Sequence, residues 1–159
     1  GLRHFPLRSW LARITAVVAL ACAAAPLRGE PVAVTDDRGV VVRLQRPAQR
    51  IVTLTPHLTE LVFAAGAGAR LAGDALHTDI ERLLVLKPDL VLAWRSGTPQ
   101  ETVARIERAG LPVFVSDAAR LEEVGRNIEA LAALAGTSDA GAAARMAFAR
   151  GLGELRARR

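Results

Sequence analysis

Hydrophobic and polar positions along the chain predict one hairpin followed by strand–helix repeats. Apolar residues alternate loosely through residues 32–44, around a turn-forming Asp-Asp-Arg-Gly cluster at 36–39, which is typical of a β-hairpin. Short apolar runs bounded by polar residues predict strands at 51–54, 70–73, 89–94 and 113–115. The run at 89–94 is almost wholly apolar, as in a strand buried on both faces of a parallel sheet.

Apolar residues three and four positions apart predict helices that follow these strands, and glycine follows three of the helices as a C-terminal cap. The helices are expected at 56–65, 78–86, 98–109, 121–135 and from 138 to the C-terminus. Thr55 is expected to cap the first, with Pro56 at the first helical position. Capping boxes of the Thr-x-x-Glu type are expected at Thr78 and Thr98. This order predicts an α/β fold: a parallel sheet with helices on both faces and right-handed crossovers, preceded by a β-hairpin and ending in a long helix.

The first 29 residues have the layout of a secretory signal peptide. Arg3, Arg8 and Arg13 precede an apolar run at 14–25, which is too short to span a bilayer. We therefore expect residues 1–29 to be a signal peptide that directs the chain to the periplasm. A buried N-terminal helix is the alternative.

Charge and cysteine content argue against two classes of function, nucleic-acid binding and thiol chemistry. The 159-residue chain, long enough for one domain, has 21 basic and 16 acidic residues. Four basic residues lie in the first 29 residues, which contain no acidic residue, so the remainder is nearly neutral and no nucleic-acid partner is expected. Cys22 is the sole cysteine, so no disulfide or thiol chemistry is expected in the exported chain. Its surroundings loosely resemble a lipid-attachment motif, and lipid anchoring there is an alternative.

Motifs of common enzyme classes are absent from the sequence. There is no Walker A loop and no Gly-x-Ser-x-Gly nucleophile elbow. The Gly-Ala-Gly at 66–68 follows a predicted helix and not a strand, so it is no dinucleotide fingerprint. Beyond the signal segment only His57 and His77 remain, without metal-ligand spacing. We expect no enzyme activity, no cofactor and no metal site made by the protein itself.

The ends of the predicted strands are the expected place for a ligand, because ligands of open parallel sheets bind outside the carboxyl ends of the strands. Those ends carry Thr55-Pro56-His57, residues 94–97 and Ser116-Asp117. Trp94 is a large aromatic residue where a buried strand turns polar. Capping of the core by its indole is the alternative to a ligand contact.

Three segments resemble the periplasmic cobalamin-binding proteins of vitamin B12 ABC importers, at residues 50–61, 79–84 and 87–97. Receptors of this class have two lobes joined by one long helix, and the resemblance runs from about residue 32 to the C-terminus. It implies that residues 30–137 form the N-terminal lobe and that 138–159 begin the interlobe helix. Siderophore and haem receptors share most of the pattern and are the alternative within the family. The Ala-Trp-Arg-Ser-Gly segment points to the cobalamin branch.

The resemblance also implies roles for single residues. Trp94 is expected to contact a corrinoid, in a pocket also lined by Thr55, Pro56, His57 and Arg95. His57 is expected to face solvent at its helix start, with cobalt ligation as the alternative. Glu81 matches the acidic residue that the family presents to arginines of the membrane permease, although helix capping explains it too, and Glu60 is a second exposed acid for that role. The implied partners are cobalamin or a related corrinoid and the permease, with the chain a monomer.

The chain departs from the family in two places. A segment with a ligand-contacting tyrosine is missing between Gly73 and Asp74, and the chain contains no Tyr. It also ends at Arg159, where the second lobe of the family would follow. We therefore expect this chain to bind a corrinoid much more weakly than a two-lobed receptor, or to be a fragment that neither binds nor docks. A small α/β enzyme that uses the strand-end crevice through Trp94, His57 and Asp117 is the alternative of another class.

Overall fold

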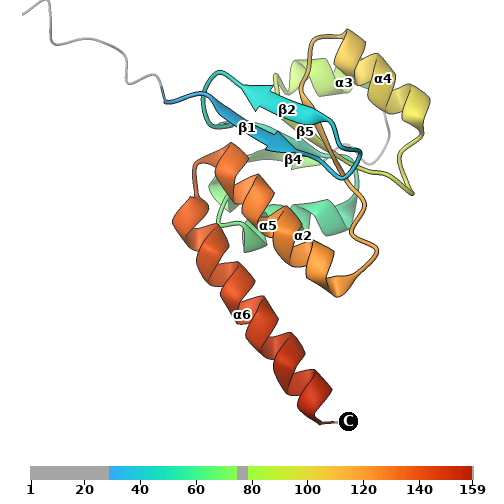
Figure 1. The fold of residues 1–159 in the computed structure, drawn as a ribbon. Helices are drawn as coiled ribbons and strands as arrows, with labels where there is room; N and C mark the ends of the chain where they lie inside the picture. The colour runs from blue at the N-terminus through green and yellow to red at the C-terminus, as the bar shows by residue number, and fades with distance from the viewer. Residues whose placement is uncertain (1–28, 75–78, 159) are drawn as a thin grey trace, which may run out of the picture.

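The computed structural model describes residues 29–74 and 79–158, which form two sheets surrounded by helices (Figure 1). β1 (Val32–Thr35) and β2 (Val41–Leu44) pair antiparallel as the predicted hairpin. The other strands are β3 (Ile51–Thr53), β4 (Leu71–Asp74), β5 (Leu90–Trp94) and β6 (Val113–Ser116). They form one parallel sheet in the order β4-β3-β5-β6. Every strand that the hydrophobic pattern predicts in these residues is therefore present.

The helices also follow the prediction, with ends set by glycine. They are α2 (Pro56–Ala64), α3 (Ile80–Val85), α4 (Gln100–Arg108), α5 (Leu121–Ala135) and α6 (Ser138–Ala157), with a 3-10 turn η1 (Gly68–Arg70) before β4. Gly66, Gly110 and Gly136 have φ angles of 73°, 83° and 70°. Glycine adopts this left-handed conformation without strain, so each of the three ends its helix.

The parallel sheet is buried on both faces, because successive side chains of a strand point to opposite sides. On one face Ile51, Leu92 and Phe114 pack with apolar residues of α2, α5 and the hairpin. On the other, Val52 and Val91 pack with apolar residues of α3 and α4. Figure 1 shows the same division, with α3 and α4 on one side and α2 and α5 on the other. The predicted α/β fold with helices on both faces is confirmed.

The strand order creates a topological switch point at the carboxyl ends of β3 and β5. The chain leaves β3, forms β4 on one side of it, and then returns to form β5 on the other side. The direction of progress through the sheet therefore reverses between β3 and β5. Ligands of open parallel sheets bind at such a switch point.

The turn of the hairpin is tied to the edge strand β6. The buried Asp36 carboxylate accepts a hydrogen bond from the Val115 backbone N–H at 3.2 Å. The Asp37 carboxylate accepts from the Asp117 backbone N–H at 2.6 Å and from the Asn127 side-chain amide at 2.9 Å. The two aspartates thus do more than form a turn, because they also hold the hairpin against the parallel sheet.

Two predicted capping boxes are wrong in detail. The N-cap of α3 is Asp79, whose carboxylate accepts from the backbone N–H of Glu81 at 2.9 Å, one residue later than expected. Thr78 lies outside the described residues. The N-cap of α4 is Pro99, because the Thr98 hydroxyl instead accepts from the Trp94 backbone N–H at 3.2 Å. Glu81 and Glu101 are therefore each the second residue of their helix, and neither completes a capping box.

The last helix, α6, packs along α5 and continues past it (Figure 1). A Cβ on Gly141 would lie 2.2 Å from the Cβ of Ala132, so glycine allows close approach near the start of α6. Met146 and Leu155 are both 62% exposed, so the large apolar side chains of this helix are covered only in part. No helix in residues 29–74 and 79–158 is long and apolar enough to cross a membrane. The predicted signal peptide and Cys22 lie outside the described residues, apart from residue 29.

Candidate functional site

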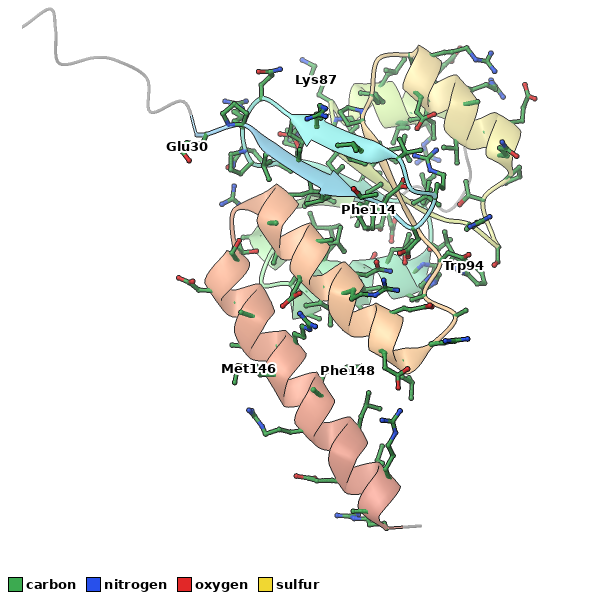
Figure 2. All side chains as sticks on the ribbon, in the orientation of Figure 1. Glu30, Lys87, Trp94, Phe114, Met146 and Phe148 are labelled. Carbon is green, nitrogen blue, oxygen red and sulfur yellow. The ribbon has the colours of Figure 1, made fainter. Side chains whose placement is uncertain are left out.

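The switch point in the strand order brings together two of the predicted ligand-binding residues. His57 in the first turn of α2 and Trp94 at the end of β5 have ring centroids 4.8 Å apart and an interplanar angle of 82°. The imidazole and indole therefore meet edge to face, the arrangement favoured by the charge distribution of aromatic rings. His57 is exposed, as expected, and Trp94 is 37% exposed. Figure 2 shows Trp94 at the rim of the lobe, while Phe114 lies in its centre.

The turn after β5 holds the Trp94 indole in place. The Trp94 carbonyl accepts from the backbone N–H groups of Gly97 at 3.1 Å and Thr98 at 2.7 Å. A Cβ on Gly97 would come within 2.3 Å of Cε3 of the indole, so the ring lies directly against the backbone of this turn. Such contact needs a glycine at position 97 and leaves part of the ring open to solvent. The sequence segment at 93–97 contains this glycine, but only the structure shows its purpose.

Thr55 and Pro56 join this pair at the end of β3. Thr55 is the N-cap residue of α2 and Pro56 is the first helical residue, as predicted. The Thr55 side chain makes no cap hydrogen bond, and its buried hydroxyl oxygen has no partner among the described residues. Pro56 is exposed beside His57. The structure therefore places both residues at the carboxyl end of β3 without showing a contact between them and Trp94.

Arg95 turns to the neighbouring strand end instead. Its guanidinium lies 3.4 Å from the Asp117 carboxylate, and its backbone N–H donates to the Ser116 carbonyl at 2.9 Å. The Arg95 side chain is 58% exposed, so the ion pair itself contributes little to stability. The backbone hydrogen bond from Arg95 to Ser116 joins the ends of β5 and β6 beside Trp94, and the ion pair lies over this junction.

An open cavity of about 530 Å³ lies next to this ion pair, between the hairpin turn, β6 and α4. Its lining includes Arg38, Val40, Arg95, Gln100 and Glu107. Arg38 pairs with Asp36 at 2.8 Å and with Glu107 at 3.0 Å. Burial works to lower the pKa of Arg38, but hydrogen bonds and the charges of these two carboxylates outweigh burial and raise it. Both arginines of the cavity are paired with carboxylates, and neither Trp94 nor His57 lines it.

The two expected docking acids are on different helices. Glu81 is exposed in the first turn of α3, and Glu60 is exposed on α2. The C-terminus of α3 is fixed by Arg50, whose guanidinium donates twice to the Leu86 carbonyl, at 2.8 and 3.0 Å. Asp79 caps α3, and within residues 29–74 and 79–158 the Glu81 carboxylate makes no hydrogen bond or ion pair. No group of three or more metal-ligating side chains occurs in the part of the chain that the structure describes.

No family model matches the chain. It is 34% identical over 128 residues to the vitamin B12-binding protein of Vibrio cholerae serotype O1, an alignment that covers 69% of this chain and 46% of that protein. The crystal structure of the periplasmic vitamin B12-binding protein BtuF of Vibrio cholerae matches with a TM-score of 0.65 and 34% identity, over 70% of this chain and 51% of that one.

Solved structures with lower sequence identity share only the fold with this chain. The periplasmic haem-binding protein HutB of Vibrio cholerae matches with a TM-score of 0.60 at 20% identity, over 70% of this chain and 50% of that one. The chain spans about half the length of the curated relatives it matches. These findings confirm the resemblance seen in the sequence, whereas the division into a lobe at 30–137 and an interlobe helix at 138–159 stays a prediction.

Proposed function

Because the chain is a partial relative of the periplasmic vitamin B12-binding proteins, we propose that it serves as a solute-binding lobe of an ABC importer. It captures a corrinoid at the carboxyl ends of β3 and β5 and presents it to the membrane permease, without bond chemistry. The proposal assigns residues 1–29 to a signal peptide for export to the periplasm, 30–137 to the binding lobe and 138–159 to the start of an interlobe helix. The observation that carries it is the Trp94–His57 pair at the switch point.

The half-exposed indole suits a large, flat and largely apolar ligand. Aromatic rings stack face to face with an offset, and a corrin ring presents such a face. Trp94 is held from behind by Gly97 and flanked by His57, so it offers its remaining surface without rearranging. Small-molecule sites bury most of the surface of their ligand, whereas a single lobe covers only one side of it. The affinity of this chain for a corrinoid is therefore expected to be far below that of a receptor that encloses the ligand between two lobes.

Titration with cyanocobalamin tests the proposal directly. In a Trp10→Phe background, bound corrinoid quenches the fluorescence of Trp94 alone, and the absorbance of the ligand after equilibrium dialysis gives the affinity independently. Trp94→Ala is expected to weaken binding about tenfold or more, since a stacked aromatic contributes about 1–3 kcal/mol. Met146→Ala, exposed on α6, is the matched control and should leave binding unchanged.

Competition decides between the ligand classes. Haemin and a ferric hydroxamate siderophore should displace cyanocobalamin only at higher concentrations. If haemin or the siderophore bound more tightly than cyanocobalamin, the lobe would belong to a haem or siderophore receptor instead. Turnover of a bound compound that is lost in Trp94→Ala, His57→Ala and Asp117→Ala would instead favour an enzyme.

Docking to the permease rests on Glu81, with Glu60 as a second contact. Two observations support this assignment. Arg50 anchors the C-terminus of α3, and the N-terminus of α3 is capped by Asp79 and not by Glu81. We expect Glu81→Arg to weaken binding to the importer permease–ATPase complex of the same genome by roughly tenfold, measured with the complex in nanodiscs. The reason is that the new arginine would repel the arginines that the family resemblance implies on the permease. Glu101→Arg, 79% exposed on α4, is the matched control. Equal binding by both variants would remove Glu81 from the docking surface.

A further inference from the structure

The hairpin has a free strand edge on the side away from α5. Among the described residues β2 pairs with β1 alone, and β1 packs on α5, so β2 is the open edge of a two-stranded sheet (Figure 1). We propose that this edge binds an extended segment of a partner protein, which adds to β2 as a third, antiparallel strand with an acidic residue opposite Arg43. The proposal goes beyond corrinoid binding, because neither Trp94 nor His57 lines the groove beside β2.

A groove runs along this edge. The cavity of about 530 Å³ between the hairpin turn, β6 and α4 adjoins a second cavity of about 280 Å³, since Val40 and Glu107 line both. The second cavity is lined by residues 40–43, at the start of β2, and by residues 110–113, which lead into β6. Side chains of a strand alternate between its two faces. A cavity lined by consecutive residues of β2 therefore borders the edge of the strand and not one of its faces.

The register of the hairpin leaves backbone groups of Val41 and Arg43 at this edge. The Asp36 N–H donates to the Val40 carbonyl at 2.9 Å, so these two residues form a hydrogen-bonded pair of the antiparallel ladder. Such pairs alternate with pairs that are not hydrogen-bonded, and Val41 and Arg43 belong to the latter. Their N–H and C=O groups point away from β1 and have no partner within residues 29–74 and 79–158. An added strand supplies the partners.

An uncovered apolar side chain also borders the groove. Val40 is 45% exposed, whereas Val42, two positions along and on the same side of the strand, is 5% exposed. The walls of the two cavities include Val103 of α4 and Leu111. An added strand would place one side chain opposite Val40 and another opposite Val42, both directed at these walls. Apolar side chains at these two positions would cover Val40 and remove apolar surface from water.

The charges along the groove favour an acidic partner. Arg38 is paired with Glu107, and Arg95 with a carboxylate at the end of β6. Arg43 is exposed and forms no ion pair in the part of the chain that the structure describes. A carboxylate directly across from it on the added strand would form a stabilising cross-strand pair. β2 contains no acidic residue, so a second copy of this strand offers no such carboxylate.

A short peptide tests the proposal through its backbone. In acetyl-Thr-Glu-Leu-Thr-Leu-Thr-amide, antiparallel pairing places the glutamate opposite Arg43, the leucines opposite Val42 and Val40, and the central threonine opposite Val41. The N–H of the central threonine then points at β2, and the N–H of the leucine before it points away. We expect saturable binding of the fluorescein-labelled peptide to the whole chain, measured by fluorescence polarisation. N-methylation of the central threonine should weaken binding about tenfold or more, because a hydrogen bond is lost and a methyl group meets β2. N-methylation of that leucine is the matched control and should leave binding unchanged.

A charge reversal on the protein tests the acidic partner. Arg43→Glu should weaken binding of the peptide about fivefold, because an attractive cross-strand pair becomes a repulsive one. Arg46→Glu, exposed and outside both cavities, is the control and should bind as the wild type does.

Three results would overturn the proposal. Equal binding of the two N-methylated peptides would show that no strand is added, and unchanged binding by Arg43→Glu would exclude the acidic partner. If the chain dimerises in analytical ultracentrifugation and the peptide does not bind, a second copy covers this edge instead. None of these results depends on whether the chain binds cyanocobalamin, so the proposed function is tested separately.

Discussion

The Asn127 side-chain amide donates a hydrogen bond of 2.9 Å to the Asp37 carboxylate, across 90 positions of sequence. The same amide nitrogen donates to the Ser116 hydroxyl at 2.7 Å, so one side chain joins α5, the hairpin turn and the end of β6. Asn127 is only 2% exposed. A buried polar side chain in such a network fixes the relative position of the elements that it joins.

Removal of this amide should loosen the hairpin. Asn127→Ala leaves the Ser116 hydroxyl and part of the Asp37 carboxylate without a donor, so we expect a loss of about 2–3 kcal/mol in the free energy of unfolding. Urea denaturation followed by circular dichroism measures it. The neighbouring exposed Arg126→Ala should change stability by less than about 0.5 kcal/mol. Similar losses in both variants would show that the network does not stabilise the fold.

The contact between Gly97 and Trp94 predicts a change in binding with little change in fold. In Gly97→Ala the new Cβ would lie 2.3 Å from Cε3 of the indole, so the ring must move. We expect a shifted Trp94 fluorescence maximum and cyanocobalamin affinity reduced about as much as in Trp94→Ala. Gly153→Ala, where a Cβ meets nothing within 4 Å, should leave both measurements unchanged. An unaltered spectrum in Gly97→Ala would mean that the turn does not position the indole.

Lys87 has a φ of 48°, the only non-glycine residue with positive φ in the described part of the chain. A side chain costs about 1–2 kcal/mol in this left-handed conformation, whereas glycine adopts it freely but gains flexibility when unfolded. Lys87→Gly should therefore equal the wild type in stability or exceed it by up to about 1 kcal/mol. Lys87→Ala keeps the strain and should not exceed it. Thermal unfolding of the three proteins measures the order, and a less stable glycine variant would contradict the argument.

The close approach of α6 to α5 depends on Gly141. A Cβ there would lie 2.2 Å from that of Ala132, so Gly141→Ala must push the helices apart. Overpacking of this kind costs about 1–3 kcal/mol, more than alanine gains in helix propensity. Gly153→Ala on the open part of α6 should instead stabilise the helix, by at most about 1 kcal/mol. Differential scanning calorimetry should show opposite shifts of Tm, and shifts in the same direction would refute the packing argument.

The sequence by itself determined the elements of this lobe, because their signals are local. Periodicity located the strands and helices, and glycines at 66, 110 and 136 marked helix ends by a conformation that other residues avoid. The placement of Trp94 at a strand end also followed from the pattern alone. Each of these conclusions depends on residues within a few positions of one another.

Only the tertiary structure decided what those residues contact. Trp94 meets His57 because β5 pairs with β3, a long-range choice that periodicity does not encode. Thr98 looked like a helix cap, but its hydroxyl accepts from the Trp94 N–H, because the tight turn after β5 brings the two groups within hydrogen-bond distance. Asp36 and Asp37 looked like turn residues alone, but the packing of the hairpin on β6 gives their carboxylates backbone donors 79 and 80 residues away. A polar side chain takes the donors that folding brings to it, and local sequence does not show which these are.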